Sequence, residues 1–464
     1  MSTRKILFLV PFKARDLEGH ALVGYHLRRR HGYDIVFSNS DRVEEKLLRY
    51  APDALVMDHL IWDFKVQQVQ FAKKLGIKVI VLPTEGLLQS EDDVLLVTGY
   101  RHSQRPNIDL YLSWGDFHRN AVMKKGFMTE DQIKTVGCPR FDFYSEPYLS
   151  LLEPKERFLS RWGIRNPDAP IILWATNTTY TSQDPKKVIQ RYISGGAFTT
   201  SRVQDFLRDG SEQHQQHSQV VLALARLHPE WNFIIKIHPS ELIDSYVPLT
   251  KNLPNVHLAF DAPIRDFLFH CDVLLQRNCT TATEAWMLGK PVLQLEMGSY
   301  SCDSRSEYKN GNHVVMDLDD ADQAIRAYLS GMPVPDEQKL ARQAFIGEFY
   351  FQVDGKASER CSELIDRVVS ADHTEVKQAA VRVAAEKEFV QWKRRQDSRL
   401  TNRFKDSVGL NREVSLRLWK RFLRRNHKPN LGLFVPAAEI TPDMVDKLYQ
   451  RYDQVLSGNL ALSA

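Results

Sequence analysis

Short apolar runs alternate with amphipathic segments along the first third of the chain. Six of these runs are typical of β-strands: residues 5–10, 34–38, 54–58, 78–82, 109–114 and 133–136. Three intervening segments carry apolar residues at helical spacing: residues 17–30, 41–50 and 62–75. Strands that alternate with helices predict a parallel sheet covered on both faces, as in a Rossmann-like domain.

The same alternation returns in the second half, after a polar stretch near residues 165–170. Further strands are expected at residues 170–175, 232–237, 256–258, 273–276 and 291–295. Helices are expected at residues 219–228, 264–270 and 281–288. Residues 177–217 have no clear period, and we expect them to form a loop over the ligand site. Two such arrays in tandem predict an α/β chain of GT-B type, in which two Rossmann-like domains face each other across a cleft.

The length predicts more than one domain, because 464 residues exceed what one hydrophobic core usually serves. We expect a first Rossmann-like domain at residues 1–160 and a second at 165–335. Residues 336–371 should form closing helices, and residues 372–464 a helical, basic extension. Each sheet should present its ligand site at the carboxyl ends of its strands.

Positive charge is concentrated in the extension. Residues 391–428 contain thirteen Lys and Arg against three Asp and Glu, a local net charge of +10, whereas the whole chain carries +4. We expect the segment 389–428 to bind an anionic membrane surface, where each base contributes about 1 kcal/mol. A docking surface for a partner protein is the alternative. No nucleic-acid-binding motif accompanies the charge, so nucleic acid is not an expected partner.

The first strand and the cysteines indicate the compartment. The apolar run 5–10 is short and ends at Pro11, which fits a strand and not a signal peptide. No run of about 18 apolar residues is present that could span a bilayer. The five cysteines lack C-x-x-C spacing, as expected in a reducing compartment. We expect a cytoplasmic protein that associates with the inner face of the membrane.

Polar residues follow two strands of the second domain. The strand 232–237 ends at a histidine, and the strand 273–276 leads into small hydroxyl residues that open a helix. The free N–H groups of a helix N-terminus bind phosphate, and a nearby histidine can donate to the phosphate or protonate a departing one. Taken singly, a packed histidine and an ordinary N-cap would explain these motifs, but at neighbouring strand ends they predict a phosphate site. Its residues are His238, Pro239, Ser240, Asn278, Cys279, Thr280 and Thr281.

Acidic residues of the first domain are candidates for a general base. Asp16 and Glu18 follow the first strand and would face the cleft from the acceptor side. A solvated helix start explains these acids equally well. Glu85 follows the fourth strand and has the same two explanations. On the donor side, His238 is the candidate acid.

Four further residues are candidates for binding. Glu284, one turn into the helix, is placed to take ribose hydroxyls, or it simply stabilises the helix. Arg140 could pair with a carboxylate or phosphate, or hold the interdomain hinge. Asn177 and Thr178 could line the same cleft. We expect no metal or other cofactor, because helix N–H groups and a histidine can neutralise the phosphate.

Five segments occur in an order that resembles the bacterial surface carbohydrate (capsule and lipopolysaccharide) biosynthesis proteins. They are residues 13–19 (KARDLEG), 109–115 (DLYLSWG), 136–142 (VGCPRFD), 238–241 (HPSE) and 278–285 (NCTTATEA). The histidine and hydroxyl pair are also similar to those of GT-B sialyltransferases and Kdo transferases, which hold the phosphate of a CMP-sugar. This resemblance implies that His238, Thr280 and Thr281 bind a CMP phosphate, although Cys-Thr-Thr stands here where those enzymes have Ser-Ser.

The resemblance implies a glycosyltransferase of surface polysaccharide biosynthesis. It would transfer a Kdo-like or nonulosonic sugar from CMP to a glycan or lipid-linked glycan acceptor, with Arg140 or Lys236 meeting the sugar carboxylate. One alternative is a UDP-sugar transferase, a UDP-sugar epimerase or a CDP-polyol phosphotransferase. A diphosphate donor predicts a second Lys or Arg in the site. Another alternative is a non-catalytic scaffold in polysaccharide assembly.

Overall fold

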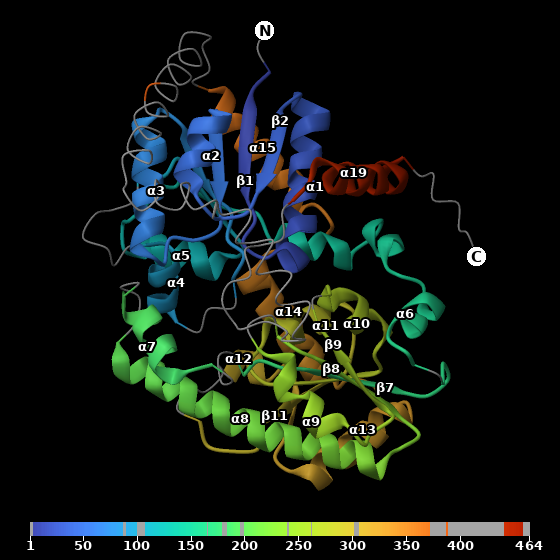
Figure 1. Cartoon of the computed structure of the whole chain (residues 1–464). Coiled ribbons are helices and arrows are strands. Elements are labelled where there is room, and N and C mark those ends of the chain that lie inside the picture. Colours follow the sequence, from blue (N-terminus) through green and yellow to red (C-terminus); the bar gives the residue numbers. More distant parts are fainter. Residues whose placement is uncertain are drawn as a thin grey trace, which may run out of the picture.

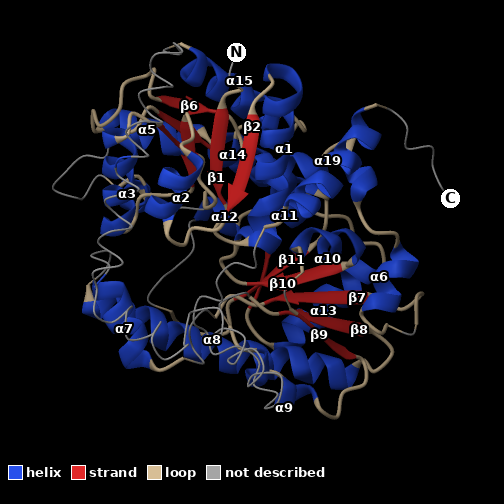
Figure 2. Ribbon diagram, turned by 45° about the horizontal axis from the view of Figure 1, so that its top comes forward, coloured by secondary structure: helices blue, strands red, loops and turns tan. Residues whose placement is uncertain are grey.

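The chain folds into two α/β domains, each built on a six-stranded sheet whose paired strands are parallel (Figure 1 and Figure 2). This arrangement confirms the two Rossmann-like domains expected from the sequence. The computed structural model describes residues 3–86, 90–99, 107–164, 166–178, 183–194, 199–238, 241–260, 262–300, 306–371, 387 and 440–457.

The first sheet has the strand order β2-β1-β3-β4-β5-β6. Its strands are β1 Lys5–Leu9, β2 Asp34–Ser38, β3 Ala54–Met57, β4 Lys78–Val81, β5 Leu110–Ser113 and β6 Ile133–Thr135, close to the predicted runs. Alternate residues of β1 enter different cores, with Ile6 and Phe8 on one side and Leu7 and Leu9 on the other. Both faces of the sheet are therefore covered, as a parallel sheet requires.

Helices cover these two faces. The helix α1, Lys13–His31, packs on one face, whereas α2, Val43–Tyr50, and α3, Asp63–Lys74, pack on the other. Two further helices of this domain are α4 Glu91–Val97 and α5 Asp116–Lys124. Because α1 begins directly after β1, its first turn lies at the carboxyl end of the sheet.

The second sheet has the order β12-β11-β10-β7-β8-β9. Its strands are β7 Ile171–Ala175, β8 Asn232–Lys236, β9 Val256–Ala259, β10 Val273–Gln276, β11 Val292–Leu295 and β12 His313–Val315. Its helices include α9 Val247–Thr250, α10 Ile264–His270, α11 Thr280–Met287, α12 Ser306–Lys309 and α13 Leu318–Leu329. The strand β7 lies between β8 and β10, so the two polar motifs are not on adjacent strands as predicted.

The loop predicted at residues 177–217 is wrong, because most of its described part is helical. This part forms α7, Pro185–Ser194, and most of α8, Thr200–Leu227. The buried face of α8 does follow a helical spacing, through Val203, Leu207, Val221 and Leu224. Gly210 and two histidines occupy the middle of that face, so an apolar period is not visible in the sequence.

The chain crosses between the domains more than once. Two 3-10 helices, η1 Pro139–Tyr144 and η2 Tyr148–Leu151, and α6, Lys155–Arg161, lead into the second domain. The helix α14, Asp336–Tyr350, packs in the second domain, and α15, Ala357–Ser370, then returns to pack on α1. The helices 336–371 therefore join the two domains rather than close the second alone.

A helix near the end of the sequence also lies on the first domain. The helix α19, Pro442–Leu456, buries Tyr449, Tyr452 and Val455 in the same core as α1 and α15 (Figure 1). The basic segment 389–428 lies outside the described residues. Within the described part of the chain, no helix is long and apolar enough to cross a membrane.

Candidate functional site

The strands of the first sheet run toward the second domain (Figure 2), so polar residues after β1 and β4 face that domain. Arg15 lies in the first turn of α1, just after β1, and Glu85 follows β4. The Arg15 guanidinium donates to a Glu85 carboxylate oxygen in a short hydrogen bond. Its Nε also lies 2.7 Å from Oδ1 of Asp16. Arg15 is thus a cation shared between two carboxylates of the first domain.

His238 approaches this cation from the second domain. Its main-chain N–H donates to the Thr176 hydroxyl at 2.9 Å, which fixes the turn after β8. Burial, together with the charges of Arg15 and Lys236, lowers the pKa of the His238 imidazole to about 4. Glu85 acts in the opposite direction. His238 is therefore neutral at pH 7, and it lies close enough to Arg15 and Glu85 for their charges to change its pKa.

The N-terminus of α11 is shaped by the loop before it. Asn278 has a positive φ of 48°, and its carbonyl accepts a hydrogen bond of 3.2 Å from the Asn177 side chain. The N–H of Cys279 is occupied, because it donates to Gln276 Oε1 and to the Tyr308 hydroxyl at 3.1 Å. The Cys279 N–H is therefore not available for a phosphate, contrary to the prediction. The N–H groups of Thr280 and Thr281, which begin the helix and have no intrahelical acceptors, remain as candidates.

Residues after β7 connect the two motifs. Thr176 binds the main chain of His238, and Asn177 binds the carbonyl of Asn278. Glu85 influences the pKa values of both His238 and Cys279. The strand ends of β8 and β10, although separated by β7, therefore face a common point opposite Glu85.

Thr280 and Thr281 differ in how accessible their hydroxyls are. Thr280 is half-buried at the helix start, whereas Thr281 is buried and lies 3.1 Å from the Cys279 sulfur through its hydroxyl. Both lie in the first turn of α11, where main-chain N–H groups have no intrahelical acceptor. Pro239 and Ser240 lie outside the described residues.

Arg140 and Glu284 meet at the boundary between the domains. Nη2 of Arg140 lies 3.6 Å from Oε1 of Glu284, and Nη1 lies 3.6 Å from Oδ1 of Asp16. The Tyr144 hydroxyl donates to the other Glu284 oxygen at 2.5 Å. Glu284 is only 4% exposed. A ribose hydroxyl that binds Glu284 would therefore have to replace one of these partners.

Two other predicted residues, both acids of α1, make structural contacts. Asp16 accepts from the Phe12 N–H at 3.2 Å and so helps to cap α1. Glu18 pairs with Arg265 of α10 at 3.1 Å and with Arg451 of α19 at 3.6 Å. These partners turn Glu18 toward the domain boundary.

Thr178 is buried beside the turn after β8, and its N–H donates to Glu241 Oε1 at 2.7 Å. The Tyr246 hydroxyl donates to the second carboxylate oxygen of the same glutamate. Thr178 therefore supports the turn rather than the cleft surface.

Arg15 and a polar group after β3 were not predicted from the sequence. Asp58 lies 2.7 Å from Nζ of Lys65 and 3.2 Å from Nε2 of His59. Burial lowers the pKa of His59, and Arg15 and Glu85 also influence it. Asp58 and His59 could have been found from their position at the end of the third predicted strand. Within the described part of the chain, no group of three His, Cys, Asp or Glu could hold a metal ion.

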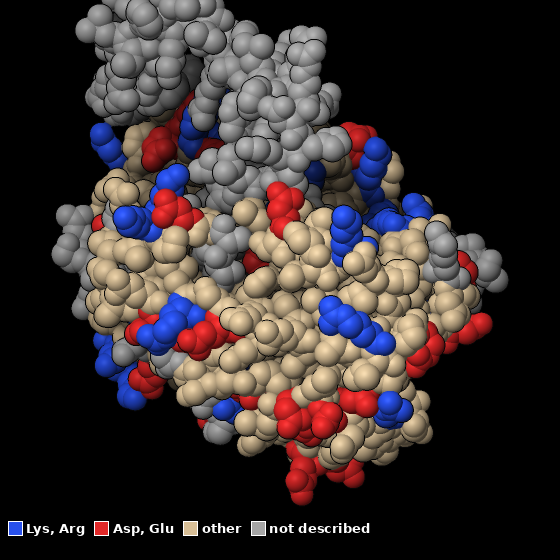
Figure 3. Space-filling model, turned by 60° about the horizontal axis from the view of Figure 1, so that its bottom comes forward, with Lys and Arg blue, Asp and Glu red and all other residues tan. Residues whose placement is uncertain are grey.

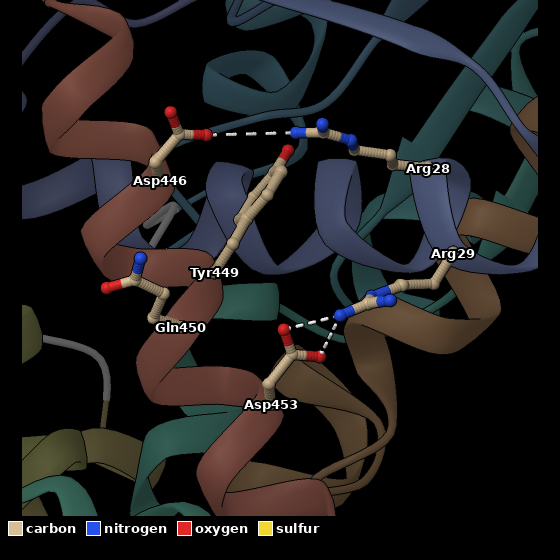
Figure 4. A pocket seen from close by; sticks show the side chains of 6 residues that line it. All are labelled: Arg28, Arg29, Asp446, Tyr449, Gln450 and Asp453. Atoms are coloured by element: carbon tan, nitrogen blue, oxygen red, sulfur yellow. Dashed lines mark hydrogen bonds and ion pairs between the residues drawn. The ribbon is translucent and has the colours of Figure 1, made fainter.

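A separate surface hollow lies between α1 and α19 (Figure 4). It lies about 20 Å along α1 from Arg15. Its charged side chains pair with one another, since Arg28 lies 3.8 Å from Asp446 and Arg29 lies 2.5 Å from Asp453. We assign this hollow to the docking of α19, and not to the candidate site.

No family model matches the chain, and no curated protein matches its sequence. Solved structures do match. The UDP co-structure of S. aureus MnaA is 11% identical, with 79% of this chain and 97% of that chain covered and a TM-score of 0.51. The UDP-GlcNAc 2-epimerase of Neisseria meningitidis bound to UDP-GlcNAc is 14% identical, with 78% and 99% covered and a TM-score of 0.51. These likenesses confirm the GT-B fold.

Proposed function

We propose that this chain is an enzyme that binds a UDP-sugar in the cleft and transfers the sugar to a glycan acceptor. The observation that carries the proposal is that Arg15, which follows β1, lies near enough to His238, which follows β8, for its charge to lower the pKa of that histidine. A diphosphate donor requires a second basic residue in the site, and Arg15 supplies it. The N-terminus of α11 adds N–H groups for the same anion.

The electrostatics of the cleft favour a diphosphate over the single phosphate of a CMP-sugar. A neutral His238 can donate one N–H but brings no charge, because its pKa is about 4. The guanidinium of Arg15 brings a permanent charge and a fork that matches two phosphate oxygens. Together they stabilise the charge that grows on UDP as it leaves, without a metal ion.

The structural neighbours support the same choice of donor. One was solved with UDP and the other with UDP-GlcNAc, and both superpose over about four-fifths of this chain. Because one is named as a UDP-GlcNAc 2-epimerase, epimerisation of a UDP-sugar is the second candidate function. Both reactions begin with the same binding of the diphosphate.

The proposed acceptor rests on the resemblance of the sequence to surface carbohydrate biosynthesis proteins. We propose a glycan or lipid-linked glycan of a bacterial surface polysaccharide as the acceptor, with the segment 389–428 on the anionic inner face of the membrane. On the face shown in Figure 3, described acidic and basic side chains are interspersed, without a continuous basic stripe. The proposal of membrane binding rests on the charge of residues 391–428, which contain thirteen Lys and Arg against three Asp and Glu. Flotation with liposomes that contain anionic lipid, with and without residues 389–428, tests this; equal flotation would contradict it.

Thermal-shift titration with UDP, CDP and CMP tests the donor. We expect UDP to raise Tm most, since a ligand at a hundredfold excess over Kd stabilises the native state by about 2.7 kcal/mol. His238→Ala should abolish the shift, and His257→Ala, in β9 of the same sheet, should keep it. A rise in Tm with CMP alone would favour the CMP-sugar hypothesis. No change in Tm with any nucleotide would favour a non-catalytic scaffold.

A further inference from the structure

We infer that Glu85 takes up the proton released in the reaction, and that Arg15 holds Glu85 until the donor diphosphate draws the guanidinium away. The inference rests on the proposed function and deepens it. The ion pair between Arg15 and Glu85 joins the residue that would bind the leaving group to the residue that would activate the acceptor.

Glu85 is held in a fixed position at the end of β4. The indole Nε1 of Trp114 donates to the carbonyl of Pro83 at 2.8 Å, two residues before Glu85. Gly86 packs so closely on the same indole that an added Cβ would lie 1.7 Å from Cε3 of Trp114. The buried Trp114 therefore fixes the backbone on both sides of Glu85, as a catalytic group requires.

Exposure separates Glu85 from the other carboxylates at this end of the first sheet. The side chains of Asp16 and Asp58 are each 2% exposed and are held by arginine or lysine. That of Glu18 is 26% exposed and lies between two arginines at the domain boundary. The Glu85 side chain is 48% exposed, with Arg15 as its ion-pair partner. An acceptor molecule can therefore reach the carboxylate of Glu85 more readily than those of the other three.

Glu85 also faces the second domain. Its charge raises the pKa of His238, and it acts on Cys279 at the start of α11. Glu85 therefore lies opposite the two strand ends to which the proposed function assigns the diphosphate.

The step can be written with all atoms accounted for. The acceptor oxygen bonds to the anomeric carbon, and its proton passes to the carboxylate of Glu85. The bond from the anomeric carbon to the diphosphate oxygen breaks, and its electron pair leaves with UDP. Arg15, having turned from Glu85 to the diphosphate, stabilises that charge. Donor binding thus frees the base, which favours donor binding before acceptor binding.

A double-mutant cycle of UDP affinity tests the sharing of Arg15. Isothermal titration would use UDP with the wild type, Arg15→Gln, Glu85→Gln and the double variant. Arg15→Gln should weaken UDP binding by about tenfold or more. Glu85→Gln should tighten it by about two- to fivefold, the equivalent of an exposed ion pair. The double variant should bind UDP no more tightly than Arg15→Gln.

Glu91→Gln is the matched control. Glu91 is 42% exposed in the same domain and forms an ion pair of 3.0 Å with Lys124. Its replacement should leave UDP affinity unchanged. Two results would contradict the inference that Arg15 is shared between Glu85 and the diphosphate. One is a Glu85→Gln variant with the UDP affinity of the wild type. The other is a Glu85→Gln change that tightens UDP binding equally in the Arg15→Gln background. A wild type that does not bind UDP would instead overturn the proposed function, so the two failures are distinguishable.

Chemical rescue tests the proton transfer. The probe is whichever of UDP-N-acetylglucosamine, UDP-glucose and UDP-galactose raises Tm most, with water as the acceptor and UDP release as the readout. Glu85→Ala should lower kcat by about 10²- to 10⁴-fold without raising KM, and formate should restore part of the rate. A purely structural role predicts no rescue. Equal release by Glu85→Ala, or no release by a wild type that binds the probe, would contradict the assignment.

Discussion

The carboxylate of Asp142 accepts a hydrogen bond of 2.8 Å from the N–H of Ser358 in α15. Its other oxygen accepts from the N–H of the preceding residue at 2.8 Å. Asp142 lies in η1, where the chain leaves the first domain, and α15 is where the chain returns to it. The buried Asp142 side chain thus caps the N-terminus of α15. It joins η1, where the chain leaves the first domain, to α15, where the chain returns.

Asp142→Asn should therefore destabilise the protein. The amide keeps one acceptor, but its NH2 group would face an N–H donor, which costs about 1–3 kcal/mol at a buried site. Urea unfolding followed by circular dichroism measures the change. Asp336→Asn, whose side chain is 91% exposed, is the control and should change stability by less than about 0.5 kcal/mol. Equal midpoints for the two variants would show that the cap contributes nothing.

Gly86→Ala should lower stability and disturb the position of Glu85. The new methyl group would overlap the Trp114 ring, so the ring or the loop must move, at a cost of about 1–3 kcal/mol. Gly347 in α14 is exposed and has nothing within 4 Å of an added Cβ, so Gly347→Ala should stabilise by about 0.5–1 kcal/mol. Opposite shifts in Tm are expected; a shift of the same sign in both variants would contradict the packing argument.

His118 makes stability depend on pH. Burial lowers the pKa of its imidazole from 6.5 to about 4. Between these values the unfolded chain takes up a proton that the folded chain does not, so stability falls as pH falls from about 6.5 to 4. His118→Phe keeps a ring but cannot titrate. Relative to this variant, the wild type should lose up to about 1.4 kcal/mol per pH unit in that window. If the free energies of unfolding of the two proteins changed in parallel with pH, the lowered pKa of His118 would be contradicted.

Glu18→Gln distinguishes a structural glutamate from a base. Because Glu18 pairs with Arg265 and Arg451, its replacement should lower the free energy of unfolding by about 1–3 kcal/mol. The UDP affinity and the rate of UDP release should stay unchanged. Loss of UDP release with wild-type stability would instead return Glu18 to the role predicted from the sequence.

Every described strand except β12, and also the motif at the start of α11, was predicted from the sequence because these signals are local. An apolar run and the polar residue after it, such as the strand β8 and His238, occupy a few consecutive positions. The part of α8 before residue 219 was missed because His217 and other polar residues lie on its buried face. Its buried positions recur at helical spacing, but because several of them are polar, the spacing does not appear as a hydrophobic period in the sequence.

The contacts between the domains were not predictable from local signals. Glu18 looked like a base at the end of the first strand, yet its partners lie some 250 and 430 positions further along the chain. The role of Arg15 depends on the approach of His238 from the other domain. Such relationships require both folded domains and the helices that join them.

A crystal structure of the complex with UDP would show where the diphosphate binds. We expect the diphosphate to lie between the His238 imidazole and the Arg15 guanidinium, with an oxygen at the N–H groups of Thr280 and Thr281. The ion pair between Arg15 and Glu85 should be broken in that complex. UDP bound elsewhere, or a cleft that stays empty at saturating UDP, would contradict the account.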